Sequence, residues 1–330
     1  MKWTPWRSCS LLIVLMLSPL LLLISLYPSA TELVKLRNAL VFNVITEAEA
    51  DWPGTAFPAS FRQEQTPLPL ALTGLMQPVM TEHAAKDLEF VLANAQRLNL
   101  HHKRKGGAIQ ANTAHTFNII AEQQQGYCAD YTQVINVLAY AIGVPVREWA
   151  IAFDGFGGHG HAFNEIWDDR RQQWIMLDVF NGFYPVRRDD QQPLSVLAFR
   201  QLLQQSPEQI QLQLIPDSAF GFRDEAMAIR YFQRGTDQFY LWWANDQLTQ
   251  ESTAIVRHLA AISIHLSQLA AIVSGQYPQI KAISQSDNQQ LLEEMLQLKR
   301  WLWRLFYLEL LLLVCLLICL YRALTSRSGS

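Results

Sequence analysis

The sequence predicts an α+β domain with a membrane-spanning helix at each end of the chain. Three observations lead to this fold class. Both ends carry long apolar segments, an amphipathic helical segment begins at Cys128, and two strand-like segments flank a polar turn between Gly160 and Asp178. Half of the 330 residues are apolar and only 17% are charged, which is typical of a globular domain flanked by membrane helices.

The first apolar segment, Ser10–Leu26, carries no charge and follows Lys2 and Arg7. Its length is at the short end for a helix that crosses a bilayer. A cleaved signal peptide is the alternative, but the apolar part of such a peptide is usually shorter, and residues 28–30 (Pro-Ser-Ala) match its cleavage site poorly. We therefore favour an uncleaved anchor.

The second apolar segment, Leu305–Tyr321, has tryptophan and tyrosine near its ends, where membrane proteins place interfacial aromatics. Glu309 is its one charge and lies near an end. A buried terminal helix of a soluble protein is the alternative. Residues 310–320 are apolar on every face, however, which favours a membrane span.

Two spans put both termini on one side of the membrane, and the basic residues Lys2, Arg7, Arg322 and Arg327 favour the cytoplasm. Basic residues that flank the opposite ends of the spans weaken this preference. The expected organisation is a cytoplasmic N-terminus (1–9), a transmembrane anchor (10–28), an N-terminal extension (29–80), a core (81–190), a mainly helical region (191–300), a transmembrane helix (301–321) and a cytoplasmic tail (322–330).

Cys128 is the only cysteine between the two apolar segments, since Cys9, Cys315 and Cys319 border or lie within them. One thiol can form neither an internal disulfide nor a multi-cysteine metal site. It is thus a free thiol available for chemistry, unless it is simply a small buried apolar residue.

The helical segment that begins at Cys128 places this thiol in or next to the first turn. Gly126 precedes it, and Gly143 and Pro145 end the helix. Unpaired amides and the helix dipole make this position electropositive, which favours the thiolate and lowers its pKa. The same amides are suited to stabilising an oxyanion during acyl transfer.

The two strand-like segments predict a histidine–carboxylate pair. If Trp167 pairs with Gln172 around a turn at 168–171, His161 lies directly opposite Asp178 on the same face of the sheet. A carboxylate in that place would hold one imidazole nitrogen and leave the other for a thiol. A slip of one residue or a bulge would break the pairing.

Residues 126–147 and 160–178 resemble the core of the transglutaminase-like superfamily. The matching motifs are Gly-x-Cys at the start of a helix that closes on Gly-Val-Pro-x-Arg147, then Gly-His-Ala-Phe-Asn-Glu165, then an aspartate on the next strand. The resemblance implies a papain/transglutaminase-like core, in which the cysteine helix packs on an antiparallel sheet that carries the histidine and aspartate. It makes Cys128 the nucleophile, His161 the general base and acid, and Asp178 the orienting residue. Val179 departs from the proline that often follows this aspartate.

We expect structural roles for most of the other polar and aromatic residues near the motifs. His159 is expected in a loop, although a metal site of His159, His161 and Asp178 with a fourth ligand is an alternative. We expect neither a metal nor a cofactor. Asp130 and Glu165 are expected to be hydrogen-bonding residues, Arg147 an ion-pair partner, and Trp149 and Trp174 core residues.

Outside the motifs, periodicity and capping residues predict further elements. Residues 101–105 (His-His-Lys-Arg-Lys) are expected to be a solvated loop, with contact to lipid headgroups or an acidic polymer as the alternative. Helices are expected at 31–46, at 81–98 with Thr81 as cap, at 113–124, 195–203, 224–233, at 253–274 ending at Gly275, and at 288–300 after Asp287; a strand is expected at 239–243.

These inferences together predict a membrane-anchored cysteine hydrolase or acyltransferase in the bacterial inner membrane, with its catalytic domain in the periplasm. Its expected partners are a peptide, protein or other amide or ester substrate of the envelope, the lipid bilayer, and surface-polysaccharide machinery. The net charge of −3 gives no basis for nucleic-acid binding. Hydrolysis is favoured over crosslinking because no calcium-binding loop is visible. Acyl transfer to a specific amine and a non-catalytic, membrane-tethered binding or scaffold module are the alternatives.

Overall fold

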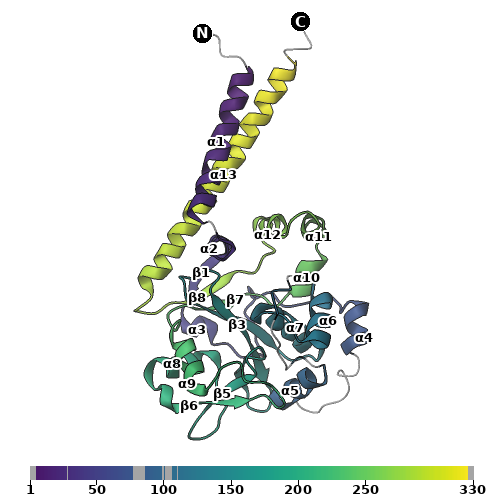
Figure 1. Cartoon of the computed structure of the whole chain (residues 1–330), viewed down its shortest axis with the longest axis vertical. Coiled ribbons are helices and arrows are strands. Elements are labelled where there is room, and N and C mark those ends of the chain that lie inside the picture. The colour runs from purple at the N-terminus through teal and green to yellow at the C-terminus, as the bar shows by residue number, and fades with distance from the viewer. Residues whose placement is uncertain are drawn as a thin grey trace.

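A mixed β-sheet wrapped by helices forms the body of the protein, and two long helices project together from one end of it (Figure 1). The computed structural model describes residues 5–27, 29–76, 86–98, 100, 106–109 and 111–325. Thr81 and the basic segment 101–105 lie outside these residues.

The central sheet has six strands in the order β1-β8-β7-β2-β3-β4, and β5 and β6 form a separate pair. Every pairing is antiparallel except that of β1 with β8. This arrangement, with its many helices, agrees with the predicted α+β class. The strands are β1 (Phe42–Ile45), β2 (Val146–Ala152), β3 (Gly160–Asp168), β4 (Gln173–Leu177), β5 (Phe183–Arg187), β6 (Ile210–Leu214), β7 (Phe239–Trp242) and β8 (Ile280–Ile283).

The helices agree with several predicted starts, because Asn112, Ser195 and Asp224 each accept a hydrogen bond from the first turn of the helix that follows. The helices are α1 (Pro5–Leu26), α2 (Ala30–Leu40), α3 (Glu47–Ala50), α4 (Leu70–Met76), α5 (Leu88–Arg97), α6 (Thr113–Gln123), α7 (Cys128–Ala141), α8 (Val196–Gln205), the 3₁₀ turn η2 (Pro207–Gln209), α9 (Glu225–Gln233), α10 (Gln247–Ser252), α11 (Ala254–Ala260), α12 (Ile264–Val273) and α13 (Gln289–Thr325).

Three predicted helices have different limits in the structure. The helix expected at 31–46 ends at Leu40, because residues 42–45 pair in parallel with β8. The helix expected to start at Thr81 starts at Leu88, and Asp87 is its N-cap. The segment 253–274 divides into α11 and α12, with Gly275 after the second helix at a φ of +72°.

The core expected at 81–190 is not a closed structural unit. The sheet takes β1 from the N-terminal extension, and β7 and β8 from the region that was expected to be mainly helical. Local periodicity cannot predict which strands join the sheet, because β1, β7 and β8 pair with segments that are far away in the sequence.

The register of the β3–β4 hairpin differs from the predicted one by two residues. Trp167 pairs with Trp174, and the four-residue turn lies at 169–172. Asp168 stays in the strand because its carboxylate accepts hydrogen bonds from the amides of Arg171 (2.7 Å) and Leu88 (3.0 Å). A shift of two keeps each side chain on its predicted face, so Asp178 stays on the face of His161 but is no longer directly opposite it.

The projecting helices α1 and α13 lie side by side, with both chain ends at the far tip (Figure 1). Of the described helices, α13 alone is long and apolar enough to be a candidate membrane span, whereas the apolar stretch of α1, Arg7–Leu23, is shorter. The first span at 10–28 therefore stays a prediction. The start of α13 is held on the domain, where Lys299 donates to the carbonyl oxygen of Phe42 and Trp303 to that of Leu40.

Candidate active site

Cys128 is the first residue of α7 and is half-buried. The turn before it is organised by Asp130, whose Oδ2 accepts hydrogen bonds from the amides of Tyr127 (2.7 Å) and Ile109 (3.1 Å). Gly126 has a φ of +129°, a conformation that favours glycine. These local interactions place the sulfur at the amino end of a helix, as the sequence predicts.

A buried polar layer holds α7 on the sheet. Asn136 of α7 donates to Glu148 of β2 (2.9 Å) and accepts from Asn164 of β3 (2.8 Å). Burial raises the pKa of Glu148 to about 7, despite the hydrogen bonds from Asn136 and Thr132. This layer sets the position of α7, and therefore of Cys128, relative to the strand that carries His161.

His161 lies between the cysteine and the aspartate. Its Nε2 is 2.7 Å from Oδ2 of Asp178, and its charge acts on the Cys128 thiol, whose pKa it lowers against the effect of burial. Because Asp178 engages Nε2, Nδ1 is the nitrogen left for the sulfur. The structure thus brings together the three residues that the sequence singles out.

Asp178 is positioned by the tight turn that follows β4. The main chains of Asp178 and Phe183 are paired, and Oδ1 of Asp178 accepts from the amide of Asn181 (3.0 Å). Gly182 completes the turn with a φ of +72°. One carboxylate oxygen therefore stabilises the turn, while the other holds the histidine.

Asn181 belongs to the same cluster and was missed in the sequence analysis. Its Nδ2 donates to Oδ2 of Asp178 (2.8 Å) and lies 3.1 Å from Nε2 of His161. The Asn-Gly pair at 181–182 was the available signal, since it predicts a turn directly after the aspartate. The hydrogen bond from the Asn181 side chain to the Asp178 carboxylate depends on side-chain geometry, which an Asn-Gly sequence does not predict.

The electrostatics of the cluster favour a thiolate–imidazolium pair. Burial raises the pKa of the Cys128 thiol, but the charge of His161 and hydrogen bonds from His161 and the Ala162 amide outweigh it, so the net shift is downward. Burial lowers the pKa of His161, but the charges of Asp178 and Cys128 raise it to about 10. Both shifts favour the charged forms in the neutral range.

Aromatic rings enclose the imidazole and exclude water from it. The side chains of His161 and Asp178 are 3% and 0% exposed. Phe163, Phe180, Tyr231 and Phe232 place their ring centroids 5.8 to 6.1 Å from that of His161. In such surroundings the charge interactions within the cluster are stronger than they would be in water.

This arrangement provides the groups that acyl transfer requires. A thiolate at a helix start can attack a carbonyl carbon, the first-turn amides can face the developing oxyanion, and an imidazolium can protonate a leaving group.

The remaining candidates lie outside this cluster. His159 is exposed, and no group of three His, Cys, Asp or Glu side chains in the described part of the chain is arranged to hold a metal ion. Glu165 accepts from Arg147 and Trp149, each at 2.6 Å, and from the Val196 amide at 2.7 Å. These contacts, like the burial of Trp149 and Trp174, are the structural roles expected of them.

Comparisons with known proteins identify the same region. Residues 77–179 match the sequence profile of the Transglutaminase-like superfamily. No curated protein matches the chain. Among solved structures, the periplasmic domain of TgpA from Pseudomonas aeruginosa bound to ethylmercury is similar over 35% of this chain and 46% of its own, with 22% identity and a TM-score of 0.26. By the sequence profile, residues 77–179 are thus similar to the transglutaminase-like core.

Proposed function

We propose that the protein is a membrane-anchored thiol enzyme that acts on an amide or ester bond, with Cys128 as nucleophile, His161 as acid and base, and Asp178 as the residue that orients the imidazole. The observation that carries this proposal is the position of His161, whose Nε2 is 2.7 Å from Oδ2 of Asp178 and whose charge, against the effect of burial, lowers the pKa of the Cys128 thiol. A purely structural cysteine does not need such partners.

In the first step, the Cys128 thiolate attacks the carbonyl carbon, and the carbonyl π electrons move to the oxygen. The tetrahedral intermediate then collapses, and the bond to the amine or alcohol breaks as His161 donates its proton to that leaving group. In the second step, His161 removes a proton from water, and the resulting hydroxide attacks the acyl carbon of the thioester. The C–S bond then breaks, which releases a carboxylic acid and restores the Cys128 thiolate beside the protonated His161. An acceptor amine in place of water would give transamidation.

We propose hydrolysis as the main reaction, because water requires no second binding site. The substrate class is a peptide, protein or other amide- or ester-bearing molecule of the bacterial envelope. Product analysis distinguishes the reactions, since incubation in H₂¹⁸O labels the released acid only if water resolves the acyl-enzyme.

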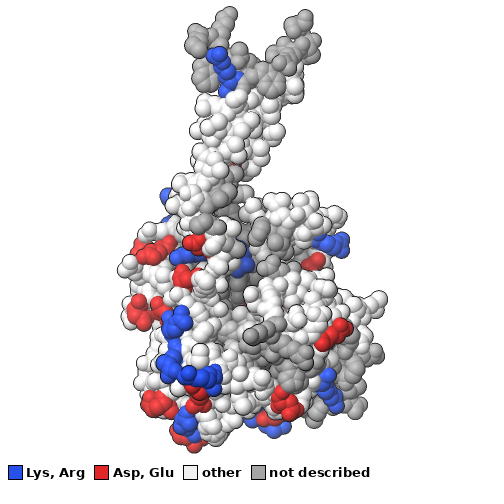
Figure 2. Space-filling view, in the orientation of Figure 1, with Lys and Arg blue, Asp and Glu red and all other residues white. Residues whose placement is uncertain are grey.

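We further propose that α1 and α13 both cross the inner membrane and hold the domain in the periplasm. Their paired arrangement, with both chain ends at one tip, supports this topology (Figure 1). Between its tip and the domain, the visible face of the projecting pair is almost free of charged groups, whereas charged groups are scattered over the domain (Figure 2).

The pH dependence of Cys128 alkylation tests the enzyme proposal directly. We expect iodoacetamide to modify Cys128 in the folded full-length chain at pH 6, well below the ordinary pKa of a thiol, because His161 stabilises the thiolate. Mass spectrometry of the Cys128 peptide across pH 5 to 10 measures the rate. Denatured protein provides the control, since the pair is lost on unfolding. A rate at pH 6 no higher than in the denatured chain would contradict the proposal and favour a binding or scaffold module.

The cellular test compares envelope proteins and glycans in strains that carry the wild-type chain, Cys128→Ala or Cys315→Ala. We expect an accumulated, uncleaved substrate in the Cys128→Ala strain alone. The Cys315→Ala strain controls for the loss of a cysteine, because Cys315 lies on α13, away from His161. Identical envelopes in all three strains would contradict a catalytic role.

A further inference from the structure

The helical hairpin α11–α12 exposes a stripe of large apolar side chains. On α12 and the turn before it, Ile262, Leu266, Leu269 and Val273 are 75%, 47%, 42% and 46% exposed. The spacing of three and four residues places Leu266, Leu269 and Val273 on one side of α12, and Ile262 lies in the turn before this helix. Ile255 on α11 is also 53% exposed. Contiguous exposed apolar surface of this kind typically marks an interaction site.

The fold of the hairpin does not require this stripe. Ser267, Ala271 and Ile272 lie on the other side of α12 and are buried. Ser267 also donates a hydrogen bond to the carbonyl oxygen of Val256 in α11 (2.9 Å), which joins the two helices. The stripe is therefore the outward face of an element that is already packed.

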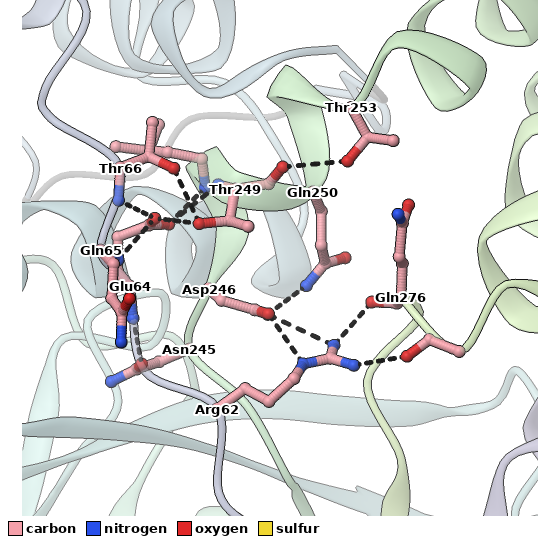
Figure 3. Close-up of polar contacts among 12 residues, drawn as sticks. Arg62, Glu64, Gln65, Thr66, Asn245, Asp246, Thr249, Gln250, Thr253 and Gln276 are labelled. Atoms are coloured by element: carbon pink, nitrogen blue, oxygen red, sulfur yellow. Dashed lines mark hydrogen bonds and ion pairs between the residues drawn. The ribbon is translucent and has the colours of Figure 1, made fainter.

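Arg62 connects the segment before α10 with the segment after α12, and so joins the two ends of the chain segment that contains the hairpin (Figure 3). Its guanidinium pairs with Asp246, just before α10, at 2.8 Å. It also donates to the carbonyl oxygens of Gly275 (2.7 Å) and Gln276 (2.6 Å), just after α12. Glu64 accepts hydrogen bonds from the first-turn amides of α10, which stabilises the start of this helix. The hairpin is consequently held in a defined place on the domain.

That place is the end of the domain from which α1 and α13 project, level with the domain end of α1 (Figure 1). The surface over α11 and α12 is largely uncharged, with charged groups at its margin (Figure 2). The sequence has no acidic residue between Glu251 and Asp287, and Arg257 is exposed on α11. A basic group beside an apolar face suits the anionic headgroups of a bacterial membrane.

We propose that α11–α12 is a membrane-contact element, whose apolar stripe enters the interface of the bilayer that α13 crosses. The proposal rests on the membrane anchoring proposed for α13. A hairpin inserted at this level gives the domain a second attachment beside the α1–α13 pair. It thereby restricts the tilt of the domain and keeps Cys128 at a constant height above the lipid.

Photo-crosslinking with lipid tests this proposal. The full-length chain is placed in nanodiscs of phosphatidylethanolamine and phosphatidylglycerol, which include a phospholipid with a diazirine in its acyl chain. After illumination, mass spectrometry maps lipid adducts to peptides. We expect adducts in residues 254–273 and, as an internal reference, in the apolar part of α13.

The matched variants replace exposed apolar residues in pairs. Leu266→Asp with Leu269→Asp should reduce hairpin adducts at least about fivefold and leave α13 adducts unchanged, because charged side chains do not enter the acyl region. Leu214→Asp with Met227→Asp changes two residues, 53% and 45% exposed, on β6 and α9 at the opposite end of the domain. That variant should keep all adducts.

Adducts in α13 without adducts in the hairpin would overturn this proposal and leave the anchoring intact. An absence of adducts in α13 as well would overturn the anchoring itself. Hairpin-to-hairpin crosslinks between two chains, in place of lipid adducts, would show that a second copy covers the stripe and would also overturn the proposal.

Discussion

At the residue scale, the two oxygens of the Asp178 carboxylate make different contacts, and both contacts help to orient His161. Oδ1 closes the turn by accepting from the Asn181 amide, and Oδ2 contacts His161 at 2.7 Å. Asn181 donates to Oδ2 as well, which keeps the carboxylate in place. The imidazole is therefore oriented by a carboxylate whose own position is set by the main chain of a tight turn.

Replacing Asp178 with asparagine should suppress the reactivity of Cys128. Without the aspartate charge the pKa of His161 falls, so the imidazolium that stabilises the thiolate is lost and the pKa of Cys128 rises. The direct repulsion between Asp178 and the thiolate acts in the opposite direction, but it is the smallest contribution. We expect alkylation at pH 6 to slow by about tenfold or more, as a pKa shift of one unit implies.

The control for Asp178→Asn is Asp168→Asn. Asp168 is another fully buried carboxylate of the β3–β4 hairpin, but it binds Arg171 and the Leu88 amide at the opposite end. We expect Asp168→Asn to lower the melting temperature and leave the alkylation rate of the folded protein unchanged. Equal slowing in both variants would mean that the loss comes from general loosening of the hairpin.

At the scale of elements, short polar contacts decide where helices and strands begin and how they meet. The carboxylate of Asp168 keeps its residue in β3 and so moves the turn to 169–172, while the Asn136–Glu148–Asn164 layer positions α7 on the sheet. Arg62 has the corresponding role for α11–α12, since it joins segments that are far apart in the sequence.

Replacing Arg62 with lysine should loosen the hairpin selectively. A lysine keeps the positive charge but cannot reach Asp246 and two carbonyl oxygens in the fixed geometry of a guanidinium. We expect amide hydrogen exchange in 253–277 to accelerate by about tenfold, a change that corresponds to about 1.4 kcal/mol in local opening. Exchange in β3 and β4 should not change, and equal acceleration there would indicate global destabilisation instead.

At the scale of the whole molecule, α13 connects the domain to the projecting pair. Its 37 residues correspond to about 55 Å at 1.5 Å per residue, which exceeds the apolar core of a bilayer. The first part of the helix, with Leu292, Met295 and Leu302 buried, packs on the domain. The remaining part, beside α1, extends away from it. Such a continuous helix would transmit the orientation of the span to the domain.

The proposed topology predicts which thiol a membrane-impermeant maleimide can reach. In cells whose outer membrane has been permeabilised, we expect labelling of Cys128, because the domain faces the periplasm. Cys9 should be protected by its position on the cytoplasmic side, and Cys315 and Cys319 by the bilayer. Cys128→Ser should abolish the signal. In inverted inner-membrane vesicles Cys128 should be unlabelled, and labelling there would reverse the proposed orientation.

The sequence by itself determined α7 and its cysteine, the strand that carries His161, the strand that directly precedes Asp178, and the apolar ends of the chain. These features depend on local signals, namely capping residues, glycines, periodicity and motif spacing, which act within a few residues. The pairing of His161 with Asp178 was also predictable, because a register that is wrong by two residues still keeps the face of each side chain. The grouping of Cys128 with this pair came from the family resemblance.

Only the tertiary structure decided the contribution of Asn181, the parallel pairing of β1 with β8, and the position of α11–α12 at the end of the domain from which α1 and α13 project. Each of these depends on contacts that no local pattern specifies. Asn181 acts through side-chain geometry within a turn. The strand β1 is completed by residues more than two hundred positions away, and the hairpin is set in place by Arg62 from a distant segment. Long-range packing and hydrogen bonding therefore override local propensity at these positions.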